Sequence, residues 1–548
     1  MKRQFIYFII LACCAFFAVM ALNASHSGFN ASRAEITAPQ WQEVELSFEA
    51  SQSYDNPYTD VEVAVVFTHS DGEQLKRPAF WDGGNVWRVR FASPTAEGQW
   101  SWRSVSSNSA DTGLNGLTGQ LQADAYGGND PLVQHGLLRM SAGDRNIIHA
   151  DGTPFLVVGD TPWALPFRGT EETVMRYAEN RQERGFNTAL LMSVQPDREA
   201  EGSRDRTAIG SFGVAFEDLA AGQLNQINVE YFQTLDTLIT ILLGHGIVPA
   251  YNPVFQGFGW KGLSTLGAHA DPREYARYTR YLIARYGARP ALWLIGADGR
   301  GSEPTIEPGG LTTEEWDAYG QPTGLHYSPF DSSHQNRAYQ SAEWLDFQWA
   351  QTGHNAEHLI YKVEAMYDNQ PPKAIANGEP TYERIGSPTN ATGWWQGHEA
   401  WLNVTSGGTM GHVYGAGGLW NWKLAADESG WPDWANTQSS WSESIEFEGS
   451  RYVGYLSRAF EGLDFADIER RHDLAGGKLA LAKPGQLYIV YLPEGGEVNL
   501  SGLTTALPYR WFDPQTGEWA DSGTVQAGSG LVAPSEAPWV LIAAEKTP

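Results

Sequence analysis

The 548-residue sequence predicts a multidomain protein, in which a (β/α)8 barrel is flanked by an N-terminal and a C-terminal β-sandwich. Near both ends of the chain, apolar and polar residues alternate with the period of half-buried strands. In the long middle segment, short apolar runs alternate instead with stretches of helical spacing. The 42% hydrophobic and 18% charged residues are typical of folded domains.

The two flanking units read as strand-rich. We assign residues 32–126 to the N-terminal sandwich, where "VEVAVVFTHSDG" places four apolar side chains on one face before an Asp-Gly turn. "FWDGGNVWRVRF" adds two aromatic-rich strands around a Gly-Gly turn. We assign residues 468–548 to the C-terminal sandwich, where "QLYIVYLP" alternates and "WFDPQTGEW" reads as two strands around a turn.

Residues 131–465 carry the pattern of a (β/α)8 barrel. Three segments have helical spacing: "TEETVMRYAENRQERG", "NVEYFQTLDTLITILLGHG" and "DPREYARYTRYLIARYG". The eight expected strands are 154–160, 187–194, 246–254, 291–298, 324–328, 344–351, 373–379 and 411–415.

Polar residues at the ends of these strands are the candidate site residues, because the active site of such a barrel lies at the carboxyl ends of its strands. Each of them alone also fits a cap or turn residue, so the prediction depends on their convergence. The expected sugar-contacting residues are Asp160, Trp163, Asn187, Tyr251, His326, Tyr382, Glu383, His412, Tyr414, Trp420 and Trp422. The aromatic members would stack on sugar faces.

Two carboxylates are placed for glycosidic cleavage, which commonly uses an acid and a nucleophile or base. Asp298 ends the fourth expected strand and Glu379 ends the seventh, nearly opposite each other across the barrel mouth. We expect Asp298 to be the acid/base and Glu379 the nucleophile, at the shorter separation of a retaining enzyme. Glu383, four residues after Glu379, is the reserve candidate.

A series of ordered blocks resembles the apiosidase-like family of glycoside hydrolases. The blocks are "GTPFLVVGDTPWAL", "RGFNTALLMSV", "NVEYFQTLD", "RYGARPALWLIGADG", "AQTGH", "NGEPTYE" and "GHVYGAGGLWNW". The flanks also resemble the N-terminal sandwich and the C-terminal collagen-binding-type sandwich attached to that family. The resemblance implies a (β/α)8 catalytic domain, with catalytic acids at Asp298 and Glu379.

One departure from the family pattern concerns the loop that carries the acid. The family usually reads Gly-Gly-Asp at the fourth strand, whereas this chain has Gly296-Ala297-Asp298. If the middle position required a positive φ, the methyl group of Ala297 would shift the backbone.

Two other functions remain open at this level. One is a non-catalytic carbohydrate-binding protein on the same barrel. The other is a lyase acting on uronic acids, which would need a Tyr or His base and a cation such as Arg300 or Arg384. An unsaturated product absorbing near 235 nm would distinguish a lyase from a hydrolase, which releases reducing sugar.

The remaining expectations concern location and ligands. Residues 1–24 read as a signal peptide or a retained N-terminal anchor, so we expect a protein that is secreted or periplasmic, or one that this segment holds at a membrane. The net charge of −27 argues against nucleic acid as a partner. Both cysteines lie in this leader, and the histidines lack a metal-binding spacing, so we expect no metal and no cofactor. The oligomeric state is left open.

Overall fold

The computed structural model describes most of the chain. The expected leader at 1–24 lies outside the described part. Among the described residues, no helix has the length and apolar character needed to cross a bilayer. The described residues are 36–198, 205–257, 259, 265–267, 269–329, 338–385, 391–431, 433 and 437–545.

The centre of the molecule is a closed barrel of eight parallel strands, which confirms the predicted fold class. Each observed strand overlaps one of the eight expected ranges, and the chain order of the strands is also their order around the barrel. The strands are β12 (Val157–Asp160), β13 (Thr188–Met192), β14 (Val248–Asn252), β15 (Leu292–Gly299), β16 (Thr323–Tyr327), β17 (Phe347–Gln351), β18 (Ala374–Glu379) and β19 (Gly411–Tyr414).

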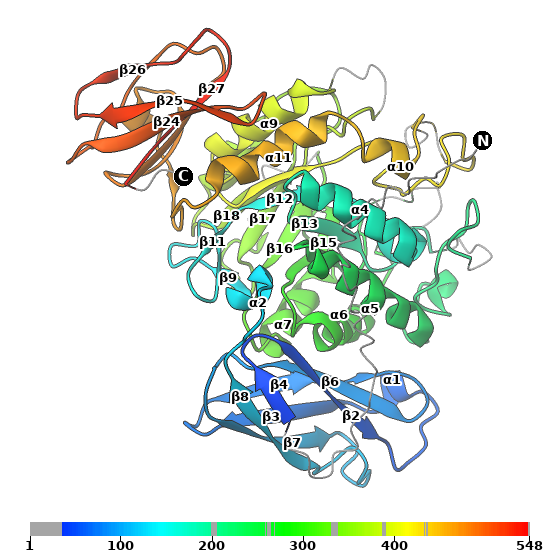
Figure 1. Ribbon diagram of the computed structural model, residues 1–548. Coiled ribbons are helices and arrows are strands. Elements are labelled where there is room, and N and C mark those ends of the chain that lie inside the picture. Colours follow the sequence, from blue (N-terminus) through cyan, green and yellow to red (C-terminus); the bar gives the residue numbers. More distant parts are fainter. Residues whose placement is uncertain are drawn as a thin grey trace, which may run out of the picture.

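Helices surround this barrel (Figure 1). The three helical segments expected from spacing are α4, α5 and α6, which confirms those predictions. The first of them begins with a capping box, in which Thr170 and Thr173 exchange side-chain and backbone hydrogen bonds. The helices of this layer are α3 (Leu165–Arg168), α4 (Glu171–Glu183), α5 (Val229–Gly244), α6 (Pro272–Tyr286), α7 (Ile306–Trp316), α8 (Tyr361–Tyr367), α9 (Trp394–Thr405), α10 (Trp441–Ser444) and α11 (Gly449–Phe460).

The barrel closes where β19 pairs with β12. Gly411 lies beside Val157 with a φ of +137°, and a Cβ built on it would come 2.0 Å from the Val157 carbonyl oxygen. Only glycine fits so close an approach of two backbones. Closure at this point brings the carboxyl ends of all eight strands to one face.

The N-terminal sandwich has a five-stranded sheet, in the order β1-β8-β7-β3-β4, and a three-stranded sheet, in the order β2-β6-β5. Its own hydrophobic core includes Phe67 and Phe91, whose rings stack 4.1 Å apart. Its elements are β1 (Ile36–Pro39), β2 (Glu43–Glu49), α1 (Pro57–Asp60), β3 (Val63–His69), β4 (Gln74–Pro78), β5 (Phe80–Trp81), β6 (Val86–Ala92), β7 (Gln99–Ser106) and β8 (Thr118–Asp124).

Between this sandwich and the barrel lies a short antiparallel sheet, which the sequence patterns did not separate from the first barrel strand. Its order is β11-β10-β9. The elements of this connection are α2 (Pro131–Gln134), β9 (Leu138–Met140), β10 (Ile147–His149) and β11 (Pro154–Phe155).

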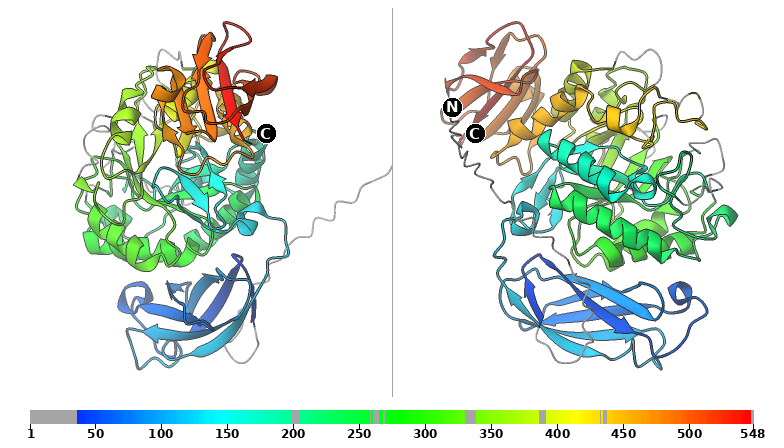
Figure 2. Two further views of the ribbon diagram at one scale, coloured as in Figure 1. Left: turned by 90° about the vertical axis from the view of Figure 1, so that its left-hand side faces the viewer. Right: turned by 45° about the vertical axis from the view of Figure 1, so that its right-hand side comes forward.

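The C-terminal domain pairs a six-stranded sheet, β20-β21-β22-β27-β24-β25, with a two-stranded sheet of β23 and β26. It lies on the opposite side of the barrel from the N-terminal sandwich (Figure 2). Its strands are β20 (Glu469–Arg470), β21 (Leu479–Lys483), β22 (Leu487–Leu492), β23 (Glu497–Asn499), β24 (Leu507–Asp513), β25 (Glu518–Val525), β26 (Gly530–Val532) and β27 (Trp539–Ala544).

The C-terminal domain packs on α9 through aromatic side chains. Trp401 of α9 is fully buried, and its ring stacks at 6.0 Å on Tyr491 of β22. The Tyr491 hydroxyl also lies 2.6 Å from Nδ1 of His398. Removal of 468–548 would therefore expose a large apolar surface of the barrel.

A buried ionic network joins the N-terminal sandwich to the barrel. Arg90 of β6 and Arg285 of α6 both bind the carboxylate of Asp236 in α5, at 2.6 Å and 2.8 Å. Burial opposes the ionisation of Asp236, but the two guanidinium groups hold its pKa well below the ordinary value. The carboxylate is thus the shared counter-ion of two arginines that come from different domains.

We expect Asp236→Asn to lower the free energy of unfolding by about 1.5–3 kcal/mol, because it removes the buried carboxylate that Arg90 and Arg285 share. The two guanidinium groups keep other ionic partners, Glu45 at 2.9 Å and Asp82 at 3.0 Å. Urea unfolding followed by tryptophan fluorescence would measure the loss.

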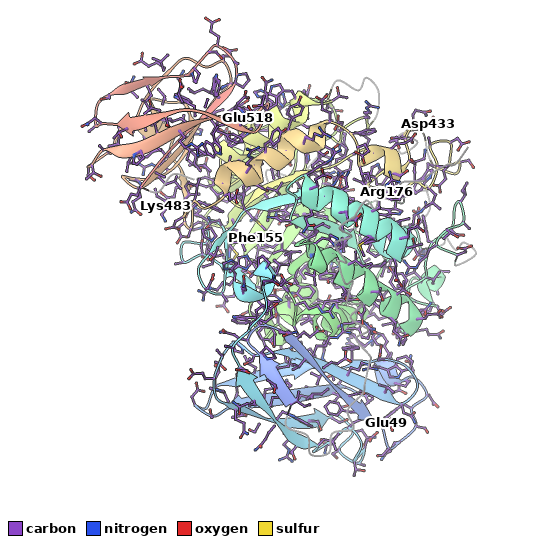
Figure 3. The ribbon with its side chains drawn as sticks, viewed as in Figure 1. Glu49, Phe155, Arg176, Asp433, Lys483 and Glu518 are labelled. Carbon is purple, nitrogen blue, oxygen red and sulfur yellow. The ribbon has the colours of Figure 1, made fainter. Side chains whose placement is uncertain are left out.

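Asp464→Asn is the matched control. Asp464 pairs at 3.0 Å with Lys483, which is labelled in Figure 3, but its side chain is 76% exposed, so the change should cost about 0–1 kcal/mol. Equal losses for the two variants would contradict a dominant role of the buried network.

Candidate active site

A cavity of about 470 Å3 opens among the loops that follow the barrel strands. Both expected catalytic acids, Asp298 and Glu379, line it. Three of the expected aromatic residues, Trp163, Tyr382 and Trp420, also line it. The other lining residues are Met192, Phe255, Pro329, Gln351, Thr352, Gly353, His354, Asn355, Leu359, Lys362 and Ile385.

A bulge sets the direction of Asp298. Between Gly296 and Gly299, β15 carries one residue more than the paired stretch of β16. Asp298 lies within this bulge and has a φ of +55°, a left-handed conformation that aspartate tolerates better than most residues. The neighbouring loop comes so close that a Cβ on Gly257 would lie 2.4 Å from Oδ2 of Asp298.

The same backbone explains why the departure at Ala297 is tolerated. Positive φ occurs at Asp298 and not at Ala297, so the methyl group does not force the strained conformation. The backbone N–H of Ala297 donates to the side-chain Oε1 of Gln256 at 2.9 Å, and the backbone N–H of Gln256 donates to the Ala297 carbonyl at 3.0 Å. Gln256 thus binds both the N–H and the carbonyl group of Ala297.

A second irregularity sets the direction of Glu379. On β17 and β18, Ala350 pairs with Asn377 but Gln351 pairs with Glu379, so Gly378 is an extra residue on β18. In regular alternation Glu379 would share a face with Asn377, whose amide bonds to Thr352 Oγ1 at 3.0 Å. The extra residue places Glu379 instead beside Gln351, which lines the cavity.

The two acids have opposite electrostatic settings. Burial, and then the nearby charge of Glu379, raise the pKa of Asp298 well above its ordinary value. A hydrogen bond with the Gln351 side chain lowers this pKa by a smaller amount. Burial also opposes ionisation of Glu379, but the polar contacts of its carboxylate with His326 and His354, and then the positive charge of these rings when protonated, outweigh burial and lower its pKa to about 2. The surroundings therefore favour the protonated form of Asp298 and the ionised form of Glu379.

Tyr382 and Trp163 form one wall of the cavity. The indole N–H of Trp163 donates to the Tyr382 hydroxyl at 2.9 Å. Burial, followed by the charge of Glu379, raises the pKa of Tyr382 well above its ordinary value, so the phenol stays neutral. Its hydroxyl can then donate a hydrogen bond toward the carboxylate.

Three residues of the first barrel strands that were expected to contact sugar do not line the cavity. Asp160 is fully buried and pairs at 2.5 Å with Arg181 of α4. Asn187 lies at the amino end of its strand, where it binds the backbone of Leu156 and Val158. Tyr251 points outward and stacks at 4.9 Å on Tyr286 of α6. These placements argue against a contact with substrate.

Four expected residues near the last strands also face the helical layer. The Glu383 carboxylate accepts hydrogen bonds from the Tyr414 hydroxyl at 2.7 Å and from the amides of Gly393 and Gly449, both at 2.9 Å. His412 is completely buried outside the cavity, with no hydrogen-bond partner among the described residues. Trp422 stacks at 4.7 Å on Trp441. The reserve acid, Glu383, therefore has a packing role.

The sequence reasoning missed several lining residues, above all His354. Its Nε2 lies 2.9 Å from Oε1 of Glu379. The available signal was the polar run "AQTGH" at the end of the sixth strand, which was used only for the resemblance. Lys362 was also missed because it lies on α8 and not at a strand end; its ammonium donates to the Pro329 carbonyl at 2.7 Å.

Among the described residues, no cluster of His, Cys, Asp and Glu has the arrangement of a metal site.

The family model for the apiosidase-like catalytic domain matches residues 141–467. The chain belongs to the apiosidase-like family. It is accordingly a glycoside hydrolase, and a carbohydrate is its substrate. A second model, for a domain of unknown function (DUF5060), matches residues 37–107, within the N-terminal sandwich. No curated protein matches the sequence.

Solved structures share the architecture of this apiosidase-like protein. A glycoside hydrolase family 5 protein from Bacteroides vulgatus is 20% identical with a TM-score of 0.62, over 75% of this chain and 94% of its own. Another Bacteroides vulgatus protein, described provisionally as a glycoside hydrolase, is 17% identical with a TM-score of 0.68, over 93% of this chain and 100% of its own. At these identities, the likeness concerns the fold.

We expect the stability of the wild type, relative to Asp298→Asn, to fall as the pH rises. The folded pKa of Asp298 is raised, so above about pH 4 the unfolded chain releases a proton that the folded chain retains, and unfolding becomes more favourable. Asparagine has no such titration. Urea unfolding of both proteins at several pH values between about 4 and 8 would measure the difference. A difference that is constant with pH would contradict the raised pKa.

Proposed function

We propose that the protein is a retaining glycoside hydrolase, with Glu379 as the nucleophile and Asp298 as the acid/base. The observation that carries the proposal is the opposite shift of the two pKa values in one cavity. A pair of carboxyl groups whose settings separate their pKa values supplies one proton donor and one ionised nucleophile at the same pH.

The proposed reaction has two displacements at the anomeric carbon. In the first, a carboxylate oxygen of Glu379 forms a bond to that carbon as the glycosidic C–O bond breaks, and Asp298 gives its proton to the leaving oxygen. In the second, Asp298 takes a proton from water, and the water oxygen replaces the Glu379 ester oxygen at the same carbon. Both carboxyl groups then regain their starting protonation states.

We further propose that the substrate is a plant or algal polysaccharide or its oligosaccharides. The rings of Trp163 and Trp420, together with Tyr382, give the cavity wall the aromatic surface on which sugars stack. The leader-like residues 1–24 favour export to the periplasm or the medium. Cell fractionation with an antibody against the mature chain would test the location.

The alternatives gain less support from the site. A non-catalytic binding protein would not need one protonated and one ionised carboxyl group. For a lyase, the cations considered were Arg300 and Arg384, and neither of them lines the cavity. Arg384 instead lies over the ring of Phe447 at 4.3 Å. Release of reducing sugar, without an unsaturated product, is therefore the expected outcome of a screen on plant and algal polysaccharides.

We expect Glu379→Gln and Asp298→Asn each to reduce turnover by at least about 100-fold on the glycan that this screen identifies, because each removes a group that reacts. Initial rates of reducing-sugar release would measure the loss. Glu383→Gln is the matched control; it should retain turnover per folded molecule while lowering the melting temperature, because its carboxylate satisfies three buried donors. An inactive Glu383→Gln beside an active Glu379→Gln would reverse the assignment.

The stereochemistry of the product tests the mechanism separately. A retaining enzyme keeps its carboxyl groups about 5–5.5 Å apart and first releases the anomer present in the substrate. Proton NMR of the reaction during the first minutes would identify that anomer. Initial release of the opposite anomer would leave a hydrolase but exclude Glu379 as a covalent nucleophile.

A further inference from the structure

Each oxygen of the Glu379 carboxylate meets one imidazole. Oε2 lies 3.1 Å from Nε2 of His326, and Oε1 lies 2.9 Å from Nε2 of His354. His326 comes from β16 and His354 from the segment after β17, so the two rings approach the carboxylate from adjacent elements.

The other nitrogen of each ring faces a main-chain amide. The Asp298 amide donates to Nδ1 of His326 at 3.1 Å, and the Tyr382 amide donates to Nδ1 of His354 at 3.4 Å. A backbone N–H can only donate, so Nδ1 of each ring must be the unprotonated nitrogen. The ring proton is then on Nε2, the nitrogen that faces Glu379.

We propose that His326 and His354 are positioning residues, whose neutral rings present Nε2–H groups to the ionised carboxylate of Glu379 and stabilise it, His354 by a hydrogen bond and His326 from a distance of 3.1 Å. This role rests on the proposed function and deepens it. It replaces the expected sugar contact of His326, and it gives His354 a role that the sequence did not suggest.

The burial of the rings favours this role over sugar binding. The His326 side chain is fully buried, and its ring packs edge-on against Trp163 at 5.6 Å between centroids. The His354 side chain is 29% exposed, but its ring packs at 4.6 Å on Tyr382. Both nitrogens of His354 are occupied, by Glu379 and by a backbone amide. Nδ1 of His326 likewise accepts from a backbone amide, whereas its Nε2 lies 3.1 Å from Glu379 without the geometry of a hydrogen bond and has no other partner among the described residues.

The arrangement also connects the two acids. The bulge of β15 that aims the Asp298 carboxyl group presents the Asp298 amide to His326, and His326 in turn faces Glu379. A shift of this bulge would therefore disturb the proton donor and the nucleophile together.

The carboxylate of Glu379 is surrounded by titratable and hydrogen-bonding groups from several elements. Burial disfavours its ionisation, whereas His326, His354 and the Tyr382 hydroxyl face the carboxylate with N–H and O–H groups. The Asp298 carboxyl group and Lys362 of α8 line the same cavity. Removal of the imidazoles leaves burial less opposed, so the pKa of Glu379 should rise and the acidic limb of kcat/KM should move to higher pH.

Glutamine and asparagine variants separate positioning from packing. The amide nitrogen of glutamine can reach the place of Nε2, whereas that of asparagine reaches only the place of Nδ1. We expect His326→Asn and His354→Asn to lower kcat about 10–100-fold with little change in KM, and to move the acidic limb upward. His326→Gln and His354→Gln should recover most of the loss. Equal effects of Gln and Asn, or a change mainly in KM, would overturn the proposal.

His412→Gln and His412→Asn are the matched controls, because His412 is fully buried and does not line the cavity. Neither should move the acidic limb. If Glu379→Gln is itself active, the proposed function fails; if it is inactive but the Gln and Asn variants behave alike, only this inference fails.

A measurement without substrate tests the ring protonation directly. The full-length protein labelled with 15N-histidine would be studied by long-range 1H–15N NMR at neutral pH, with the two signals assigned from their loss in His326→Gln and His354→Gln. We expect both rings as the neutral form with the proton on Nε2. A proton on Nδ1 of either ring would overturn the proposal.

Discussion

The closure of β12 against β19 is the contact on which the rest of the molecule depends. Gly411 allows the two backbones to meet, and a side chain there would collide with the Val157 carbonyl. Once the ring of strands is closed, every strand delivers its carboxyl end to one face, and the loops between them must gather around a common space. Asp298 and Glu379, which are 81 positions apart in sequence, become neighbours for this reason.

Closure alone does not aim the side chains; two local departures from regular strand geometry do so. The bulge at Asp298 and the extra residue at Gly378 both lie on strands that carry a candidate catalytic acid. Each departure changes which face the following residue occupies. The imidazoles of His326 and His354 each lie between a backbone amide and the Glu379 carboxylate. Under the proposed role of these rings, the backbone at Asp298 and Tyr382 helps to set the ionisation of Glu379.

The sequence predicted much of this architecture. The eight strands, the three helices and the fold class followed from periodicity, and both acids that line the cavity followed from their places at strand ends. The direction in which individual side chains point could not be predicted from the sequence. Tyr251 and Trp422 lie at or near strand ends, yet they pack outward, because the direction of a side chain depends on register and bulges that periodicity does not reveal. His354 was missed because it acts through a loop.

The ionic network around Asp236 has a consequence for the history of the chain. Its members come from β6 of the sandwich and from α5 and α6 of the barrel, so Asp236 has both of its arginine partners only when the two domains are together. A barrel that exchanged its N-terminal neighbour by recombination would inherit Arg285 and Asp236 without Arg90. The two domains are therefore expected to be inherited as a single unit and to unfold together, although each has its own hydrophobic core.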